Sequence, residues 1–287
     1  NFDALFYFEL AKLELICYVV VMRIRGTTLR LKLRRVVLYC LAVPCVLFIL
    51  IVCVAGCFAD KVIFQPPDTR AIYSETMLDL APGIDISLRF TPPPNNGYVL
   101  LYSHGNAEDL WTIRYLMEEY SQHGYGVAAY DYEGYGHSGG KPSEAAAYRD
   151  IECVWNYLTA ERKISPKSIV IYGRSVGSGP ACYLAEKVDA KALVLEAPFT
   201  STFAVAGLGF LPFNRFVNID RIDKINMPLL IIHGDKDRIV PYSHGKKLFS
   251  VAKEPKQLYT AEGAGHNNII RRERKRYWQT LKMFLNP

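Results

Sequence analysis

Short apolar, β-branched runs alternate along most of the chain with longer stretches whose apolar residues recur at helical spacing. The runs that this pattern predicts as buried strands are 98–102, 168–172, 192–195, 228–232 and 257–259. The stretches that it predicts as helices are 107–123, 143–161, 178–188, 242–252 and 271–285. Such alternation favours a mostly parallel sheet with helices on both faces.

A hairpin is predicted ahead of these elements. The runs 76–80 and 85–90 are joined through Pro82 and Gly83, which favours an antiparallel pair at the start of the sheet. About 225 residues follow the N-terminal region, and a chain of that length can bury one sizeable core. The sequence therefore predicts a single α/β domain over residues 59–287.

An apolar segment without a charge covers residues 36–58, a length that suits one membrane span. The segment before it, residues 1–35, is basic, whereas only Lys61 follows closely. Because positively charged flanks stay in the cytoplasm, this asymmetry predicts a cytoplasmic N-terminus and an extracytoplasmic domain. The basic residues next to the apolar segment are Arg23, Arg25, Arg30, Lys32, Arg34 and Arg35.

Alternatives exist for this N-terminal region. Residues 1–21 carry charges within an apolar run, so we expect either a gene-model extension ahead of a start at Met22 or an amphipathic surface helix. From Met22, the chain up to Cys57 also fits a bacterial lipoprotein signal, with cleavage before Cys57 and lipid on its sulfur. The apolar stretch is long for a signal, so an uncleaved membrane anchor is favoured.

The net charge of +6 comes largely from this basic segment, so it indicates topology and predicts no nucleic-acid partner. Five of the seven cysteines lie in the N-terminal region, and nothing indicates a disulfide framework. No Cys/His cluster has metal-ligand spacing and no P-loop pattern is present, so we predict neither a metal nor a cofactor. A second basic run, 271–276, predicts a solvated helix face or a contact with anionic headgroups.

The pattern Gly-x-Ser-x-Gly occupies residues 173–177, between a predicted strand and a predicted helix. In that context it is typical of a nucleophile elbow, where the serine, here Ser175, sits on a sharp turn. A Cβ at Gly173 or Gly177 would collide with the neighbouring strand or helix. The N–H groups of the following helix would stabilise an anion near the serine. The alternative is a glycine-rich turn with an incidental serine.

A base and an acid are expected on loops after later strands, in the chain order serine, acid, histidine. His266 lies in a small-residue loop after the strand 257–259, and Asp237 follows the strand 228–232. We predict that His266 is the base and that Asp237 holds its other ring nitrogen. Asp235 follows its strand too closely to reach the histidine and is expected to cap the turn. Glu196 is the rival acid.

An oxyanion hole needs two backbone donors. One is expected at Val176, directly after the serine, and the other in the His-Gly turn that follows the strand 98–102. We predict that this second N–H belongs to Asn106, with Ala107 as the alternative. His104 is expected to pack the loop without moving protons.

These motifs together resemble the Bem46-like α/β-hydrolases, a group that includes membrane-associated protein depalmitoylases of animals. The resemblance runs from about Val62 to the C-terminus and rests on residues 104–107, 131–136, 139–144, 173–177 and 263–267. It implies an α/β-hydrolase fold and a serine hydrolase of ester or thioester bonds that uses Ser175, Asp237 and His266. Arg174 departs from the animal depalmitoylases, which usually carry Gln there, so the substrate preference is expected to differ.

The segment from Phe199 to Met227, where this fold inserts its cap, is short and rich in apolar residues. One interpretation is a small packed cap. The other is that its surface lines an acyl pocket or touches lipid, with Phe203, Phe210 and Phe213 as the candidate lining residues.

The favoured function is that of a membrane-anchored serine hydrolase acting through an acyl-enzyme on an acyl ester or thioester, presented by a lipid or an acylated protein. The same triad would also serve a lysophospholipase, a lipase or a serine peptidase. A non-catalytic scaffold on the same fold is the alternative from a different class. Because competent residues fill every position of the triad and both oxyanion loops, the enzyme is favoured over the scaffold.

Overall fold

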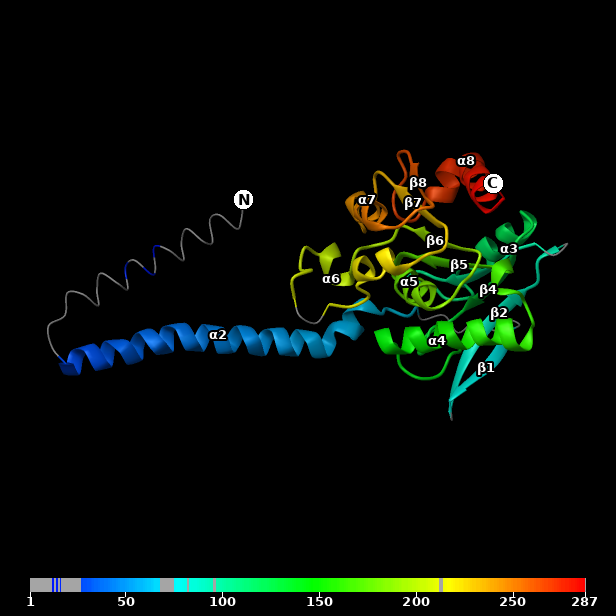
Figure 1. Cartoon of the computed structure of the whole chain (residues 1–287). Helices are drawn as coiled ribbons and strands as arrows, with labels where there is room; N and C mark the ends of the chain where they lie inside the picture. Colours follow the sequence, from blue (N-terminus) through cyan, green and yellow to red (C-terminus); the bar gives the residue numbers. More distant parts are fainter. Residues whose placement is uncertain are drawn as a thin grey trace. The chain divides into compact units, whose positions relative to one another are not determined.

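The computed structural model describes residues 12, 14, 16, 27–67, 75–81, 83–94, 97–211 and 214–286 (Figure 1). The chain forms two compact units, Asn1–Phe58 and Ala59–Pro287.

The first unit is represented chiefly by the helix α2, Thr27–Ile63, which continues into the start of the second. Within the described residues, α2 holds the one segment long and apolar enough to cross a membrane, Leu33–Leu50, and its side chains from 38 to 50 are exposed. A membrane span over 36–58 stays a prediction. Cys57 lies in α2, but its side chain is outside the described set, as are Met22 and most of residues 1–21.

The second unit is built on an eight-stranded sheet with the order β1-β2-β4-β3-β5-β6-β7-β8. The antiparallel pairs are β1 with β2, which confirms the predicted hairpin, and β2 with β4; the other pairs are parallel. The strands are β1 (Thr76–Ala81), β2 (Ile84–Thr91), β3 (Val99–Ser103), β4 (Gly126–Tyr130), β5 (Ile169–Arg174), β6 (Ala192–Glu196), β7 (Leu229–Gly234) and β8 (Lys256–Ala261).

Helices cover both faces of this sheet (Figure 1). They are α3 (Arg114–Gln122), α4 (Glu144–Asn156), α5 (Ser178–Lys187), α6 (Thr202–Val205), α7 (Tyr242–Val251) and α8 (Ile269–Leu285). Alternate residues of each central strand feed two separate cores, as the period of a strand requires. In β3, Leu101 packs with α4, α5 and α7, whereas Leu100 packs with α3 and α8.

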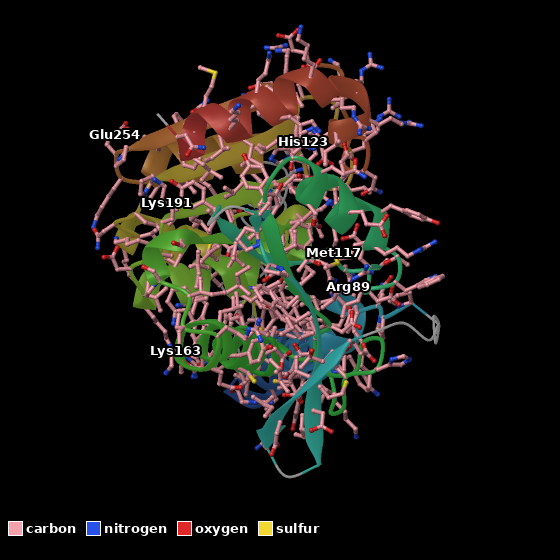
Figure 2. The ribbon with its side chains drawn as sticks, turned by 90° about the vertical axis from the view of Figure 1, so that its right-hand side faces the viewer. Arg89, Met117, His123, Lys163, Lys191 and Glu254 are labelled. Carbon is pink, nitrogen blue, oxygen red and sulfur yellow. The ribbon has the colours of Figure 1, made fainter. Side chains whose placement is uncertain are left out.

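The helices α3 and α8 lie side by side (Figure 2), where the ring of His123 stacks on Trp278 at a centroid distance of 3.8 Å. This packing confirms the predicted mostly parallel sheet between two helical layers. It also brings the C-terminal helix against the segment that follows β3.

Two predicted helices differ from the structure. The helix expected over 107–123 begins only at Arg114, because Asp109 and Thr112 bond each other's backbone N–H groups at 2.7 and 2.8 Å. Such local side-chain bonds compete with the helical ladder. The helix expected over 143–161 is α-helical to Asn156 and closes with a π-turn over Tyr157–Glu161.

Candidate active site

The turn after β5 places Ser175 in the left-handed region, with φ of 52°. Residues 175–177 form a 3₁₀ turn that leads into α5. Neither flanking glycine has room for a side chain: a Cβ on Gly177 would lie 2.1 Å from the Ser103 carbonyl oxygen, and one on Gly173 would lie 2.4 Å from that of Gly177. The predicted need for both glycines is confirmed, and the serine is held on a sharp elbow.

The loops after β5, β7 and β8 bring Ser175, Asp237 and His266 together. Nε2 of His266 lies 2.9 Å from Oγ of Ser175, and its Nδ1 lies 2.7 Å from Oδ2 of Asp237. These strands run parallel, so their carboxyl ends meet at one edge of the sheet. This geometry suits the predicted roles of Ser175 as nucleophile, His266 as base and Asp237 as the group that orients the base.

Asp237 is buried, and the hydrogen bonds that it accepts favour its ionised form. Its Oδ1 accepts the backbone N–H groups of Ile239 and Val240 at 2.9 and 2.8 Å. Burial alone would raise the pKa of Asp237, but hydrogen bonds from His233 and His266 and the backbone donors hold that pKa below its ordinary value. A carboxylate that stays ionised can stabilise an imidazolium at His266.

The sequence analysis missed His233, the buried residue beneath this carboxylate. Its Nε2 lies 2.9 Å from the Val240 carbonyl oxygen and 3.4 Å from Oδ2 of Asp237. Its place at the end of β7, four residues before the acid, was the only signal that could have revealed it. His233 therefore helps to hold the Asp237 carboxylate in place and ionised.

The two carboxylates set aside in the sequence have other partners. Oδ1 of Asp235 accepts the backbone N–H of Gly263 at 2.6 Å, so this residue caps the turn before His266, as predicted. Glu196 is buried and accepts the hydroxyls of Tyr172 and Tyr277 at 2.5 and 3.1 Å. The structure thus pairs His266 with Asp237 and ties Glu196 into the core.

The two turns predicted to form the oxyanion hole leave the sheet side by side, because Ser103 of β3 pairs with Gly173 of β5. The side chain of Asn106 is fixed there: its Oδ1 accepts the Tyr135 hydroxyl and the Gln65 backbone N–H, each at 2.8 Å. Val176 is buried on the neighbouring turn. The roles of the Asn106 and Val176 N–H groups stay predictions.

His104 packs the base of this loop. Its buried ring lies 4.4 Å from the ring of Tyr132, and the Tyr132 hydroxyl donates to the His104 carbonyl oxygen at 2.7 Å. These contacts agree with a structural role for the histidine.

The cap residues are only partly described. Phe203 is half-buried on α6, Phe210 is 76% exposed, and Phe213 lies outside the described residues. Phe216, another apolar residue of the segment from Phe199 to Met227, is fully buried, with its ring 5.8 Å from that of Phe64. Its backbone lies in the left-handed region with φ of 47°, and the side chain belongs to the core cluster on one face of the sheet.

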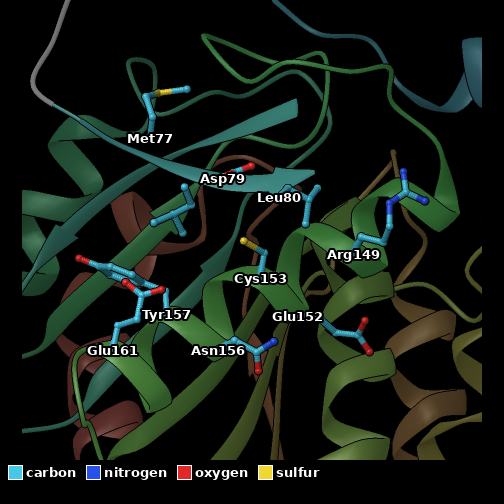
Figure 3. A pocket seen from close by; sticks show the side chains of 10 residues that line it. Met77, Asp79, Leu80, Arg149, Glu152, Cys153, Asn156, Tyr157 and Glu161 are labelled. Atoms are coloured by element: carbon cyan, nitrogen blue, oxygen red, sulfur yellow. The ribbon is translucent and has the colours of Figure 1, made fainter. Parts of the chain in front are cut away.

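A cavity of about 550 Å³ lies elsewhere, between the edge strand β1 and α4 (Figure 3). Asp79, Arg149, Glu152 and Cys153 are among the residues that line it. No triad residue reaches it, and in the sheet β1 is separated from β5 by three strands. The cavity is therefore not the site assembled around Ser175.

Solved structures share this fold at low sequence identity. The Pyrococcus furiosus esterase Pf2001 superposes with a TM-score of 0.65 at 19% identity, covering 78% of this chain and 96% of that one. The α/β-hydrolase GrgF from Penicillium sp. sh18 superposes with a TM-score of 0.61 at 16% identity, covering 74% and 97%. These likenesses show the α/β-hydrolase fold.

Sequence relatives narrow the family. A family profile described as "Serine aminopeptidase, S33" matches residues 94–218. The human alpha/beta hydrolase domain-containing protein 17B is 40% identical over 197 residues, which cover 67% of this chain and 68% of the relative. The mouse alpha/beta hydrolase domain-containing protein 17C is 36% identical over 197 residues, covering 67% and 61%. The chain therefore belongs to the Bem46-like α/β-hydrolases, a family of hydrolases that includes these animal proteins.

Proposed function

We propose that the protein is a membrane-anchored serine hydrolase that cleaves acyl esters or thioesters through an acyl-enzyme. The observation that carries this proposal is the continuous chain of contacts from Ser175 through His266 to the buried Asp237, at 2.9 and 2.7 Å. Esterases among the solved structures of the same fold support the choice of an ester substrate.

In the first half of the reaction, Oγ of Ser175 attacks the acyl carbonyl carbon while Nε2 of His266 takes the hydroxyl proton. The backbone N–H groups of Asn106 and Val176 bind the oxyanion that forms. His266 then gives its proton to the leaving alcohol or thiol, and the acyl group stays on the serine.

In the second half, a water molecule attacks the acyl-serine ester. His266 takes a proton from that water and returns it to Oγ of Ser175, which releases the carboxylic acid. Asp237 accepts the Nδ1–H throughout, which keeps the tautomer with a free Nε2 and stabilises the imidazolium.

A fatty or medium-length acyl group is the proposed substrate moiety. Large apolar side chains stand exposed in the cap segment and in the loop after Asp237: Phe210 is 76% exposed, Leu208 45%, and Ile239, two residues after Asp237, 56%. Burying such surface against an acyl chain contributes about 0.8 kcal/mol per methylene. For a peptidase, in contrast, kcat/KM on acyl esters would not rise with the length of the acyl chain.

The proposed anchor is the segment 36–58, with a cytoplasmic N-terminus and an extracytoplasmic catalytic domain. The basic residues ahead of it support this topology. A lipoprotein anchored through Cys57 is the alternative, and Cys57→Ser separates the two: it would abolish lipid labelling and leave a longer, uncleaved chain only in the lipoprotein.

Labelling with a fluorophosphonate tests the chemistry. The wild type should be labelled and Ser175→Ala should not. Ser250→Ala, a serine exposed on α7, is the control and should label like the wild type. Equal labelling of Ser175→Ala would refute the proposed nucleophile.

A further inference from the structure

The residue before the serine, Arg174, has a buried guanidinium that contacts segments far apart in the chain. It is 8% exposed. Nη1 donates to the carboxylate of Glu108, and Nε donates to Oε1 of Glu196 at 3.3 Å. Nη2 donates to the His266 carbonyl oxygen at 3.3 Å and to Oδ1 of Asn267 at 2.7 Å.

The contact of Arg174 with Glu108 reaches the turn after β3 that carries Asn106, which we call the oxyanion turn. Oε2 of Glu108 accepts the backbone N–H of Gly105 at 2.6 Å, and Gly105 directly precedes Asn106. The guanidinium also packs on this backbone, since a Cβ on Gly105 would lie 2.8 Å from Nη1 of Arg174. The conformation of the turn thus depends on the ion pair between Arg174 and Glu108.

The contacts of Nη2 of Arg174 reach the loop after β8 that carries His266. Nη2 holds the backbone of His266 and the side chain of the next residue, Asn267. Because an arginine fork has its donors in fixed geometry, one guanidinium sets both loops relative to each other and to its neighbour Ser175.

The carboxylate of Glu196 fixes the far side of the guanidinium. Glu196 also accepts the hydroxyls of Tyr172 and Tyr277, and the latter hydroxyl lies 2.6 Å from that of Tyr120. This cluster ties β5, β6, α3 and α8 together in the core. The guanidinium of Arg174 is therefore fixed to the core on the side of Glu196, and from there it contacts the two loops.

Glu108 and Arg174 hold each other in their charged forms. Burial alone would raise the pKa of Glu108, but the Arg174 cation holds it below its ordinary value. Burial alone would lower the pKa of Arg174, whereas Glu108 and Glu196 raise it. Hydrogen bonds between charged groups are stronger than neutral ones, which suits a positioning role.

We propose that Arg174 is a positioning residue that sets the oxyanion turn and the His266 loop in register with Ser175. This role rests on the proposed function, because it acts through the groups of that site. A displacement of about 1 Å in such a site can reduce the rate by about a hundredfold. Arg174→Gln should therefore lower kcat by about a hundredfold and change KM little.

The test compares Arg174→Gln and Asn267→Ala, singly and together, in the full-length protein. Asn267 is exposed, so its truncation should leave the fold intact. Arg221→Gln is the matched control, because Arg221 also pairs with a partly buried carboxylate, that of Glu186, but contacts neither catalytic loop in the described residues. The measurements are Tm, the rate of fluorophosphonate labelling, and kcat and KM on a p-nitrophenyl ester well below the Tm.

We expect Asn267→Ala to lower kcat about tenfold in the wild type and less than about twofold in Arg174→Gln, since coupled residues are non-additive. Arg221→Gln should lower only Tm. If Arg174→Gln does not fold, Glu108→Gln replaces it in the cycle, because it loosens the same guanidinium. Arg174→Lys keeps the charge but not the fork, and should recover Tm more than kcat.

Two results would overturn the role of Arg174: equal effects of Asn267→Ala in both backgrounds, or an Arg174→Gln protein with wild-type kcat. In either case a labelled wild type, with Ser175→Ala unlabelled, would leave the proposed hydrolase standing. An unlabelled wild type would instead refute the hydrolase itself.

Discussion

Replacing Asp237 by asparagine should stop the reaction without unfolding the protein. The two oxygens of this carboxylate have separate partners: Oδ1 accepts two backbone N–H groups, and Oδ2 faces Nδ1 of His266. An asparagine must keep its oxygen toward the backbone donors, so its NH₂ group faces the histidine. Nδ1 then becomes an acceptor, the proton moves to Nε2, and the base can no longer take a proton from Ser175.

The expected loss is about ten-thousand-fold in kcat, the scale of a wrong-tautomer substitution in a triad, or about 5.4 kcal/mol in the activation free energy. The assay is the release of p-nitrophenol from a short acyl ester, with Tm measured in parallel. Asp235→Asn is the control: its oxygen can still accept the Gly263 N–H, so its kcat should stay near that of the wild type.

The same substitution, Asp237→Asn, should change how the free energy of unfolding depends on pH in the acid range. The pKa of Asp237 is lower in the fold than its ordinary value of 3.8. The ionised carboxylate therefore stabilises the fold above that value, and this contribution is lost as the pH falls toward the lower folded pKa. Asp237→Asn has no carboxylate at this position, so its free energy of unfolding should lack this part of the pH dependence.

An Asp237→Asn variant with kcat within tenfold of the wild type would refute the argument that Asp237 orients His266.

Three further predictions concern the substrate, the topology and the elbow. kcat/KM should rise with acyl length until the groove fills, and Phe210→Ala should flatten that rise while sparing acetyl esters; a flat wild-type profile would exclude an acyl groove. A reporter active only after export, fused after residue 287, should be active, and a cytoplasmic signal would contradict the topology. Gly177→Ala should abolish labelling and lower Tm, because its Cβ meets the Ser103 backbone; wild-type labelling would count against the tight elbow.

The sequence was informative wherever one local pattern determined the structure. Apolar strands bounded by small residues predicted β3, β5 and β7, and the glycines at 173 and 177 predicted the elbow between β5 and α5. The chain order of strands then placed Asp237 and His266 on loops that the parallel sheet brings together. Local periodicity and strand order were enough for these features.

Contacts between distant side chains left no such pattern. Arg174 meets Glu108 across 66 positions and Asn267 across 93, and nothing in the spacing of polar residues marks that pairing. The late start of α3 has a local cause: the spacing of apolar residues predicted a helix from 107, but the mutual bonds of Asp109 and Thr112 hold a turn there. Phe216 is the same residue type as the exposed Phe210, so residue type and apolar pattern could not predict that Phe216 is buried.

The left-handed backbone at Ser175 costs conformational free energy, although the proposed reaction needs a serine at this position. An L-residue in this region is disfavoured by about 1 kcal/mol or more, whereas glycine adopts it readily. Ser175→Gly should thus be more stable than Ser175→Ala by about 1 kcal/mol, although both lack the hydroxyl. A gene copy released from selection for hydrolysis would gain stability by drifting to glycine here. Glycine at this position in a homologue would therefore be a mark of lost activity on a preserved fold.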